Sequence, residues 1–110
     1  GVGPRLKGSL EIPGLKLDGK GKVVSYDMEA QCDWVFQNVK YVLEDAGVRW
    51  ENLVHVTVFL TNMKNDFAKY YNVYKEYFPD PPTQPCRTTV EVNALLTPIA
   101  IELKCIAVFD

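Results

Sequence analysis

The sequence has few of the residues that metal centres and disulfide frameworks need. Its only histidine is His55, and its three cysteines are odd in number and show no CxxC spacing. A single histidine cannot build a histidine-based metal cluster, and a catalytic triad would depend on that one ring. The cysteine pattern argues against a disulfide framework and a zinc site, and it is typical of the reducing cytoplasm. We therefore expect a cytoplasmic protein without a bound metal.

Long apolar runs and an excess of basic charge are absent as well. No stretch of eighteen apolar residues occurs, so the sequence predicts no membrane-spanning helix, and no signal peptide is recognisable. Twelve basic residues stand against fourteen acidic ones, a net charge of −2. Because nucleic acids are bound through clustered lysines and arginines, we expect neither a nucleic acid nor a membrane as partner.

What is present is the composition of one small globular domain. The 110 residues are 47% hydrophobic and 24% charged, so we expect residues 1–110 to form a single unit with a modest core. Residues 1–21 are rich in glycine, proline and lysine and are predicted to be a long surface loop, with short extended pieces at residues 10–12 and 15–17. The chain begins at GVGPR without a methionine, so we expect further residues upstream.

Periodicity predicts a helix and then a strand. Asp27 is a suitable N-cap, apolar residues follow at intervals of three and four, and Gly47 ends the helix. In LVHVTVFL, residues 53–60, valines and leucines occupy alternate positions, which predicts a strand with one apolar face.

A second helix and two closing strands complete the predicted fold. After the turn TNMKND, Asn65 or Asp66 can cap a helix over residues 67–78. PDPPTQP is predicted to be a stiff loop, and strands are expected at residues 87–92 and 99–109. Two helices on one face of a mixed sheet give a two-layer α+β domain. Three strands make a thin sheet, so we expect missing strands, either upstream of the first residue or from a neighbouring subunit.

Two charges in the closing strands are the first candidates for chemistry. We predict that these strands pair directly as a hairpin, with Val92 opposite Thr97. In that register Arg87 lies opposite Glu102 on one face, which Thr89 shares. The apolar neighbours of the glutamate would desolvate its carboxylate and make it a better base near neutral pH. From the pattern alone, a solvent-exposed salt bridge of little consequence is an equal alternative.

Other reactive side chains suit structural roles better. Cys86 lies next to a cation that would stabilise a thiolate, but no base accompanies it. His55 lies among valines and is expected to be a hydrogen-bonded core or interface residue. The second helix carries tyrosines that could form a ligand-stacking surface, although their helical spacing favours packing. They are Tyr70, Tyr71, Tyr74 and Tyr77.

Several segments together resemble the RidA/YjgF family of imine and enamine deaminases. They are the strand start CRTTVEV, the glutamate fifteen residues after its arginine, the segment VTVFLTNMKNDFAKYYNVYKEYF and the helix EAQCDWVFQNVKYVLEDAG. The resemblance covers residues 27–108. It implies a chorismate-mutase-like fold and a homotrimer with active sites in the clefts between subunits. It also implies hydrolysis of 2-imino or enamine acids to 2-oxo acids and ammonia, without metal or organic cofactor.

The resemblance further implies roles for single residues. Arg87 matches the family's carboxylate-binding arginine, and Glu102 matches the glutamate thought to place or activate the water. Thr89 matches a pocket position that is often cysteine. Where the family usually has asparagine in the second helix, this chain has Tyr71 followed by Asn72, so either the pocket is reshaped or Asn72 substitutes. The family's first strands, which bring a tyrosine and a serine to the pocket, are expected upstream of the first residue.

The long loop at the start of the chain resembles the subgroup of 2-aminomuconate deaminases, whose substrate carries two carboxylates. Arg5 or Lys7 in this loop is the expected partner of the second carboxylate. A broad 2-iminopropanoate-type deaminase is the rival within the family, and a non-catalytic, carboxylate-binding or regulatory trimer is the rival of a different class. Ribonuclease activity has been attached to some relatives, but the acidic balance gives it little support.

Overall fold

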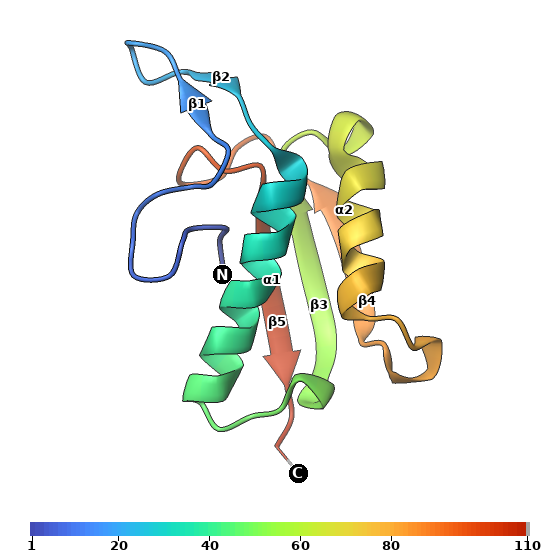
Figure 1. Cartoon of the computed structure of the whole chain (residues 1–110). Coiled ribbons are helices and arrows are strands. Elements are labelled where there is room, and N and C mark those ends of the chain that lie inside the picture. Colours follow the sequence, from blue (N-terminus) through green and yellow to red (C-terminus); the bar gives the residue numbers. More distant parts are fainter. Residues whose placement is uncertain (110) are drawn as a thin grey trace.

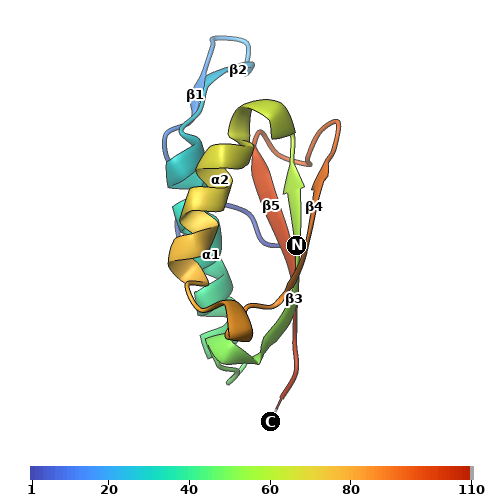
Figure 2. The same ribbon diagram turned by 90° about the vertical axis from the view of Figure 1, so that its right-hand side faces the viewer.

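Two helices cover one face of a three-stranded sheet in the computed structural model, which describes residues 1–109 apart from the side chain of Thr83 (Figure 1). The helices are α1 (Met28–Asp45) and α2 (Met63–Tyr77), and the strands are β3 (Leu53–Leu60), β4 (Cys86–Glu91) and β5 (Ile101–Ala107). Figure 2 shows both helices on the same side of the sheet. The predicted two-layer α+β fold is confirmed. No helix among the described residues is long and apolar enough to cross a membrane.

The ends of α1 agree with the prediction. The Asp27 side chain accepts a hydrogen bond from the backbone N–H of Ala30 at 3.1 Å, as an N-cap does. After Asp45 the chain leaves the helix at Gly47, whose φ of 71° lies in the left-handed region that glycine reaches without strain. The inward face of α1 is apolar and packs on the sheet. Its buried residues include Cys32, Val35, Phe36, Val39 and Leu43.

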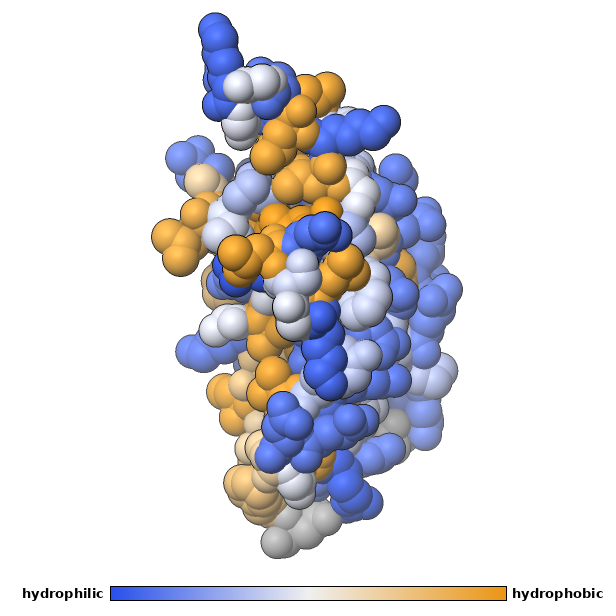
Figure 3. Space-filling view, turned by 60° about the vertical axis from the view of Figure 1, so that its left-hand side comes forward, coloured by the Kyte–Doolittle hydropathy of each residue, from blue (hydrophilic) through white to orange (hydrophobic). Residues whose placement is uncertain are grey.

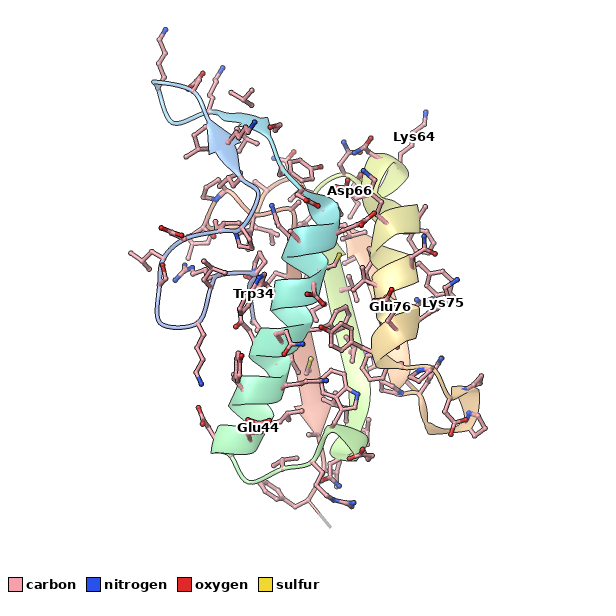
Figure 4. All side chains as sticks on the ribbon, in the orientation of Figure 1. Trp34, Glu44, Lys64, Asp66, Lys75 and Glu76 are labelled. Atoms are coloured by element: carbon pink, nitrogen blue, oxygen red, sulfur yellow. The ribbon has the colours of Figure 1, made fainter. Side chains whose placement is uncertain are left out.

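The second helix begins earlier than the sequence predicts. Its N-cap is Asn62, whose side chain accepts a hydrogen bond from the backbone N–H of Asn65 at 3.3 Å, so neither predicted cap is correct. Asp66 instead faces inward, where its carboxylate accepts a 2.6 Å hydrogen bond from the Tyr26 hydroxyl. Figure 4 shows Asp66 between the start of α1 and α2. The first turn of α2 is rich in polar residues, so its sequence resembles that of a loop. One of these residues, Asp66, is buried because its carboxylate accepts the hydrogen bond from Tyr26.

The predicted hairpin of the last two strands is wrong. The strand order is β4-β3-β5, with β4 parallel and β5 antiparallel to β3. Because α2 carries the chain from the end of β3 back to its start, β4 has to enter the sheet parallel to β3. Residues 92–100 then cross from one edge of the sheet to the other. The central position goes to β3, the strand with the most regular apolar alternation.

The first 25 residues form an arm that lies outside the three-stranded sheet except where its first residues meet β5. Two short strands pair within it, β1 (Lys16–Leu17) and β2 (Val23–Ser25), and Figure 1 shows them at the end where α1 begins. The extended piece predicted at residues 15–17 is therefore present, the one at 10–12 is not a strand, and β2 was not predicted. Val2 forms a backbone bridge with Leu103, which places the start of the chain along the outer edge of β5.

The face of the sheet opposite the helices is not covered by another element. We call this the open sheet face, and the register assigns to it Cys86, Thr88, Val90, His55, Thr57, Phe59, Glu102, Lys104 and Ile106. Ile106 is 46% exposed and Val90 is 36% exposed. Such exposure is typical of a surface that meets another chain. Figure 3 views the molecule from the side of the N-terminal arm and α1, where apolar side chains also gather among hydrophilic ones.

Candidate functional site

Arg87 lies near the start of β4, on the face that α2 covers. The register pairs it with Val56, a core residue, so both side chains project toward the helices. Arg87 Nη1 donates a hydrogen bond to the Tyr70 hydroxyl at 3.4 Å. The guanidinium carbon lies 4.8 Å from the ring centroid of Tyr74 and 5.0 Å from that of Tyr71. Aromatic faces at these distances attract a cation and hold it in place.

Tyr70 connects Arg87 to Thr89. Its hydroxyl is 3.4 Å from Thr89 Oγ1, and its side chain is fully buried. Burial raises the pKa of Tyr70, so the hydroxyl remains a neutral hydrogen-bonding group at physiological pH. The sequence prediction treated this tyrosine as packing and missed its polar contacts. The order of strand, helix and strand could have indicated these contacts. A helix that links two parallel strands lies over them, so residues of its inner face lie near residues of those strands.

Of the two residues predicted to line the pocket on α2, the structure brings only one to Arg87. Tyr71 lies beside the guanidinium and is 37% exposed. Asn72 is exposed and lies about 100° further round the helix, because an α-helix has 3.6 residues per turn. Within one chain, Tyr71 is therefore the residue in contact with Arg87, and Asn72 is not.

Glu102 lies on the opposite side of the sheet from Arg87. It pairs with Phe59, and its half-buried side chain projects from the open sheet face on the other edge strand. The prediction that Arg87 and Glu102 face one cleft within a single chain is wrong, because it depended on the hairpin. Ile101 and Leu103 do not surround the carboxylate either, since strand alternation points both into the core.

A cavity beside Glu102 also contains Arg5. It measures about 410 Å³, and both side chains line it at the outer edge of β5. Asn38 fixes this part of the arm, because its Nδ2 donates to the backbone oxygens of Gly3 at 2.9 Å and of Arg5 at 2.6 Å. Lys7 lies elsewhere, with its Nζ 4.1 Å from the ring centroid of Tyr41. Of the two basic residues predicted for a second carboxylate, only Arg5 therefore shares a cavity with Glu102.

The remaining candidates gather on the open sheet face. Cys86 is exposed there as the cross-strand neighbour of His55, on the side of the sheet opposite the Arg87 guanidinium. His55 Nε2 lies 3.3 Å from Thr88 Oγ1, in agreement with the predicted hydrogen-bonded role. Within residues 1–109, no three His, Cys, Asp or Glu side chains come together in a group that could hold a metal ion.

Comparison with known proteins shows the relationships of the chain. Residues 8–109 match the model of the family described as Endoribonuclease L-PSP. The chain belongs to this family. Its members include the RidA/YjgF proteins, so the predicted resemblance is confirmed.

Curated relatives match over most of the chain. A RutC family protein of Pyrococcus abyssi is 41% identical over 87 residues, which are 79% of this chain and 66% of the relative. A RutC family protein of Synechocystis is 40% identical over 100 residues, 91% of this chain and 72% of the relative. The chain thus spans about two thirds of the length of these relatives. Reactive Intermediate Deaminase A, chloroplastic, of Arabidopsis thaliana is 36% identical over 87 residues, which are 79% of this chain and 45% of the relative.

Solved structures share the same fold. The structure of E. coli TdcF with bound serine has a TM-score of 0.81 and 31% identity, covering 100% of this chain and 77% of that one. The structure of the YjgF gene product from E. coli has a TM-score of 0.79 and 32% identity, covering 98% and 76%. Two helices packed against a mixed sheet are therefore the RidA/YjgF architecture in this chain too.

Proposed function

We propose that this RidA/YjgF protein is a cofactor-independent hydrolytic deaminase that converts an imine or enamine acid to the oxo acid and ammonia. The observation that carries the proposal is the state of Arg87. Within residues 1–109 no carboxylate forms an ion pair with its guanidinium, which three tyrosine rings and a hydroxyl hold in place. A fixed guanidinium binds a carboxylate through two parallel hydrogen bonds and orients it as a lysine could not.

The proposed active site combines residues of two subunits. Arg87 and Thr89 come from the helix-covered face of one copy, and Glu102 comes from the open sheet face of another. The opposite orientation of Arg87 and Glu102 within one chain supports this division. So does the apolar surface around Ile106 and Val90, which another copy would cover. A homotrimer, as the family resemblance implies, supplies three such sites.

The chemistry needs one base and one positioned water. With the substrate carboxylate on Arg87, the adjacent C=N carbon is electrophilic, and water adds to it while Glu102 accepts a proton. The glutamic acid gives this proton to the nitrogen, which completes a carbinolamine. Glu102 then takes the proton of the new hydroxyl group and passes it to the amine, so that the C–N bond breaks and NH3 leaves as the C=O bond forms. An enamine first takes a proton on carbon to become the imine. Atoms and charges balance without a redox step.

The finer form of the proposal is a substrate with two carboxylates, such as 2-aminomuconate. Arg5 lines the same cavity as Glu102, so it is available to bind a second carboxylate on the side of the site opposite Arg87. Replacement of Arg5 by alanine is then expected to weaken the binding of dicarboxylic enamines and to leave monocarboxylic imines nearly unaffected.

A second candidate is a non-catalytic trimer that binds small carboxylates. The structure of TdcF, a relative with the same fold, holds serine, which is a small carboxylate. In that case Arg87 would serve binding alone, and Glu102 would not matter for turnover.

Steady-state kinetics test the function directly. Imino acids are generated in situ from amino acids with an oxidase, and oxo acid release is followed for the wild type, Arg87→Ala and Glu102→Gln. We expect Arg87→Ala to raise KM by about 100-fold, as for a lost charged hydrogen-bond pair, and Glu102→Gln to lower kcat by about 100-fold with little change in KM. Carboxylate binding without any turnover in the wild type would support the non-catalytic trimer and refute the deaminase.

A further inference from the structure

We infer that Tyr71 makes this site selective for planar, conjugated carboxylic acids over saturated ones. The inference rests on the proposed function only in that Arg87 is taken as the carboxylate-binding residue. It concerns the chain of the ligand beyond the reacting carbon, which the reaction itself does not specify.

The first observation is a row of stacked rings on α2. The rings of Phe67 and Tyr71 are 5.8 Å apart with an interplanar angle of 13°, and those of Tyr71 and Tyr74 are 6.4 Å apart at 16°. Three rings are therefore nearly parallel along one side of the helix. Tyr74 is buried, whereas Phe67 and Tyr71 are each 37% exposed. Tyr71 is the middle ring of this row, and a ligand can reach it where its side chain is exposed.

The second observation is that two cations lie against Tyr71. The guanidinium carbon of Arg87 and the Nζ of Lys75 are each 5.0 Å from its ring centroid. Figure 4 shows Lys75 on the outer side of α2, away from α1. Since neither cation has a carboxylate partner among the described residues, the positive potential around the ring is available to an anion.

These two observations favour a particular shape of ligand. A carboxylate bound by Arg87 lies in the plane of the guanidinium, and a conjugated chain continues in the plane of the carboxylate. Such a chain is flat and can turn a π-face to the Tyr71 ring, because the guanidinium that holds its carboxylate lies 5.0 Å from the centroid of that ring. A saturated chain of equal length is neither flat nor polarisable in this way, and it also loses more rotational freedom when it binds. The ring should therefore discriminate between the two.

Direct binding of two matched acids tests the inference. Sorbate, a planar six-carbon dienoate, and hexanoate, its saturated analogue, carry the same charge on the same number of carbons. Calorimetric titration of the native assembly is expected to give about fivefold tighter binding of sorbate, the size expected for one stacking contact. Tyr71→Leu should remove this preference by weakening sorbate alone. Tyr71→Phe keeps the ring and should retain the preference.

The binding experiment does not require turnover, so its result can be judged separately from the test of deaminase activity. A sorbate preference that Tyr71→Leu abolishes supports the inference even if no imine is hydrolysed. Equal affinity for both acids in the wild type, or a preference unchanged in Tyr71→Leu, overturns it even if the protein is an efficient deaminase. Sedimentation of each variant serves as the control. If Tyr71→Leu weakens both acids equally and changes the assembly, the ring has a packing role and the inference is wrong.

Discussion

At the level of single residues, the hydroxyl groups of Tyr26 and Tyr77 make the stability of the fold depend on pH. It donates to Asp66, and burial together with this carboxylate raises the pKa of Tyr26 from about 10 to about 12. Burial likewise raises the pKa of Tyr77 to about 12, with the nearby carboxylate of Asp33 adding to the effect. Both hydroxyls therefore hold their protons more tightly in the folded chain than in the unfolded one.

These shifts predict a loss of stability in alkaline solution. Between about pH 10 and pH 12 the unfolded chain has released protons that the folded chain retains, so the free energy of unfolding falls as the pH rises. Below about pH 10 the stabilisation is complete. Urea unfolding over this range measures the slope, and Tyr26→Phe should make it shallower. A slope that is the same in Tyr26→Phe and in the wild type would contradict this role of the Tyr26 hydroxyl.

At the level of elements, the start of α2 offers a test of the cap. Asn62→Ala removes the side-chain acceptor for the backbone N–H of Asn65 and should lower the free energy of unfolding by about 1 kcal/mol. Asn72→Ala is the matched control within the same helix, because that residue is exposed and in the helix interior. It should leave stability unchanged or slightly higher, since alanine is the better helix former. Equal effects of the two substitutions would show that Asn62 does not cap α2.

The sequence was sufficient to predict elements with a clear period. Apolar spacing and an aspartate cap predict α1, and strict alternation predicts β3, within one or two residues at each end. The start of α2 could not be predicted in the same way. Its first turn contains Asp66, a charged residue that is buried only because Tyr26, forty residues earlier, reaches it. The residues next to Asp66 in the sequence give no sign of this contact with Tyr26.

Pairing between strands was harder to predict than the strands themselves. The hairpin assigned Arg87 and Glu102 to one face because it assumed that strands next to each other in sequence also pair. The order of elements contained the correction, since a strand, a helix and a second strand form a parallel crossover unit. Recognising that unit would have placed Arg87 under α2, beside Tyr70. The residues predicted for the site were thus chosen by type and resemblance, and their arrangement required the structure.

At the level of the whole molecule, the open sheet face is the surface on which we propose that copies of the chain associate. Ile106→Asp introduces a charge on this face and should weaken self-association at least about 100-fold, because a buried unpaired carboxylate is costly. Folding should survive, since the side chain is 46% exposed in the single chain. Lys69→Asp, on the exposed surface of α2, is the control and should leave association unchanged. Sedimentation velocity over a range of concentrations measures both, and an unchanged mass for Ile106→Asp would contradict this interface.

The central claim is that catalysis joins Arg87 of one copy to Glu102 of another, and mixing of subunits tests it most directly. Arg87→Ala and Glu102→Gln are each expected to keep only about one hundredth of the wild-type kcat/KM when assembled alone. When equal amounts are unfolded together and refolded, about one quarter of the sites should combine an intact arginine with an intact glutamate and recover wild-type turnover. A site formed within one chain would carry a defect in every copy. Mixed assemblies that form but show no more activity than the separate variants would contradict the account.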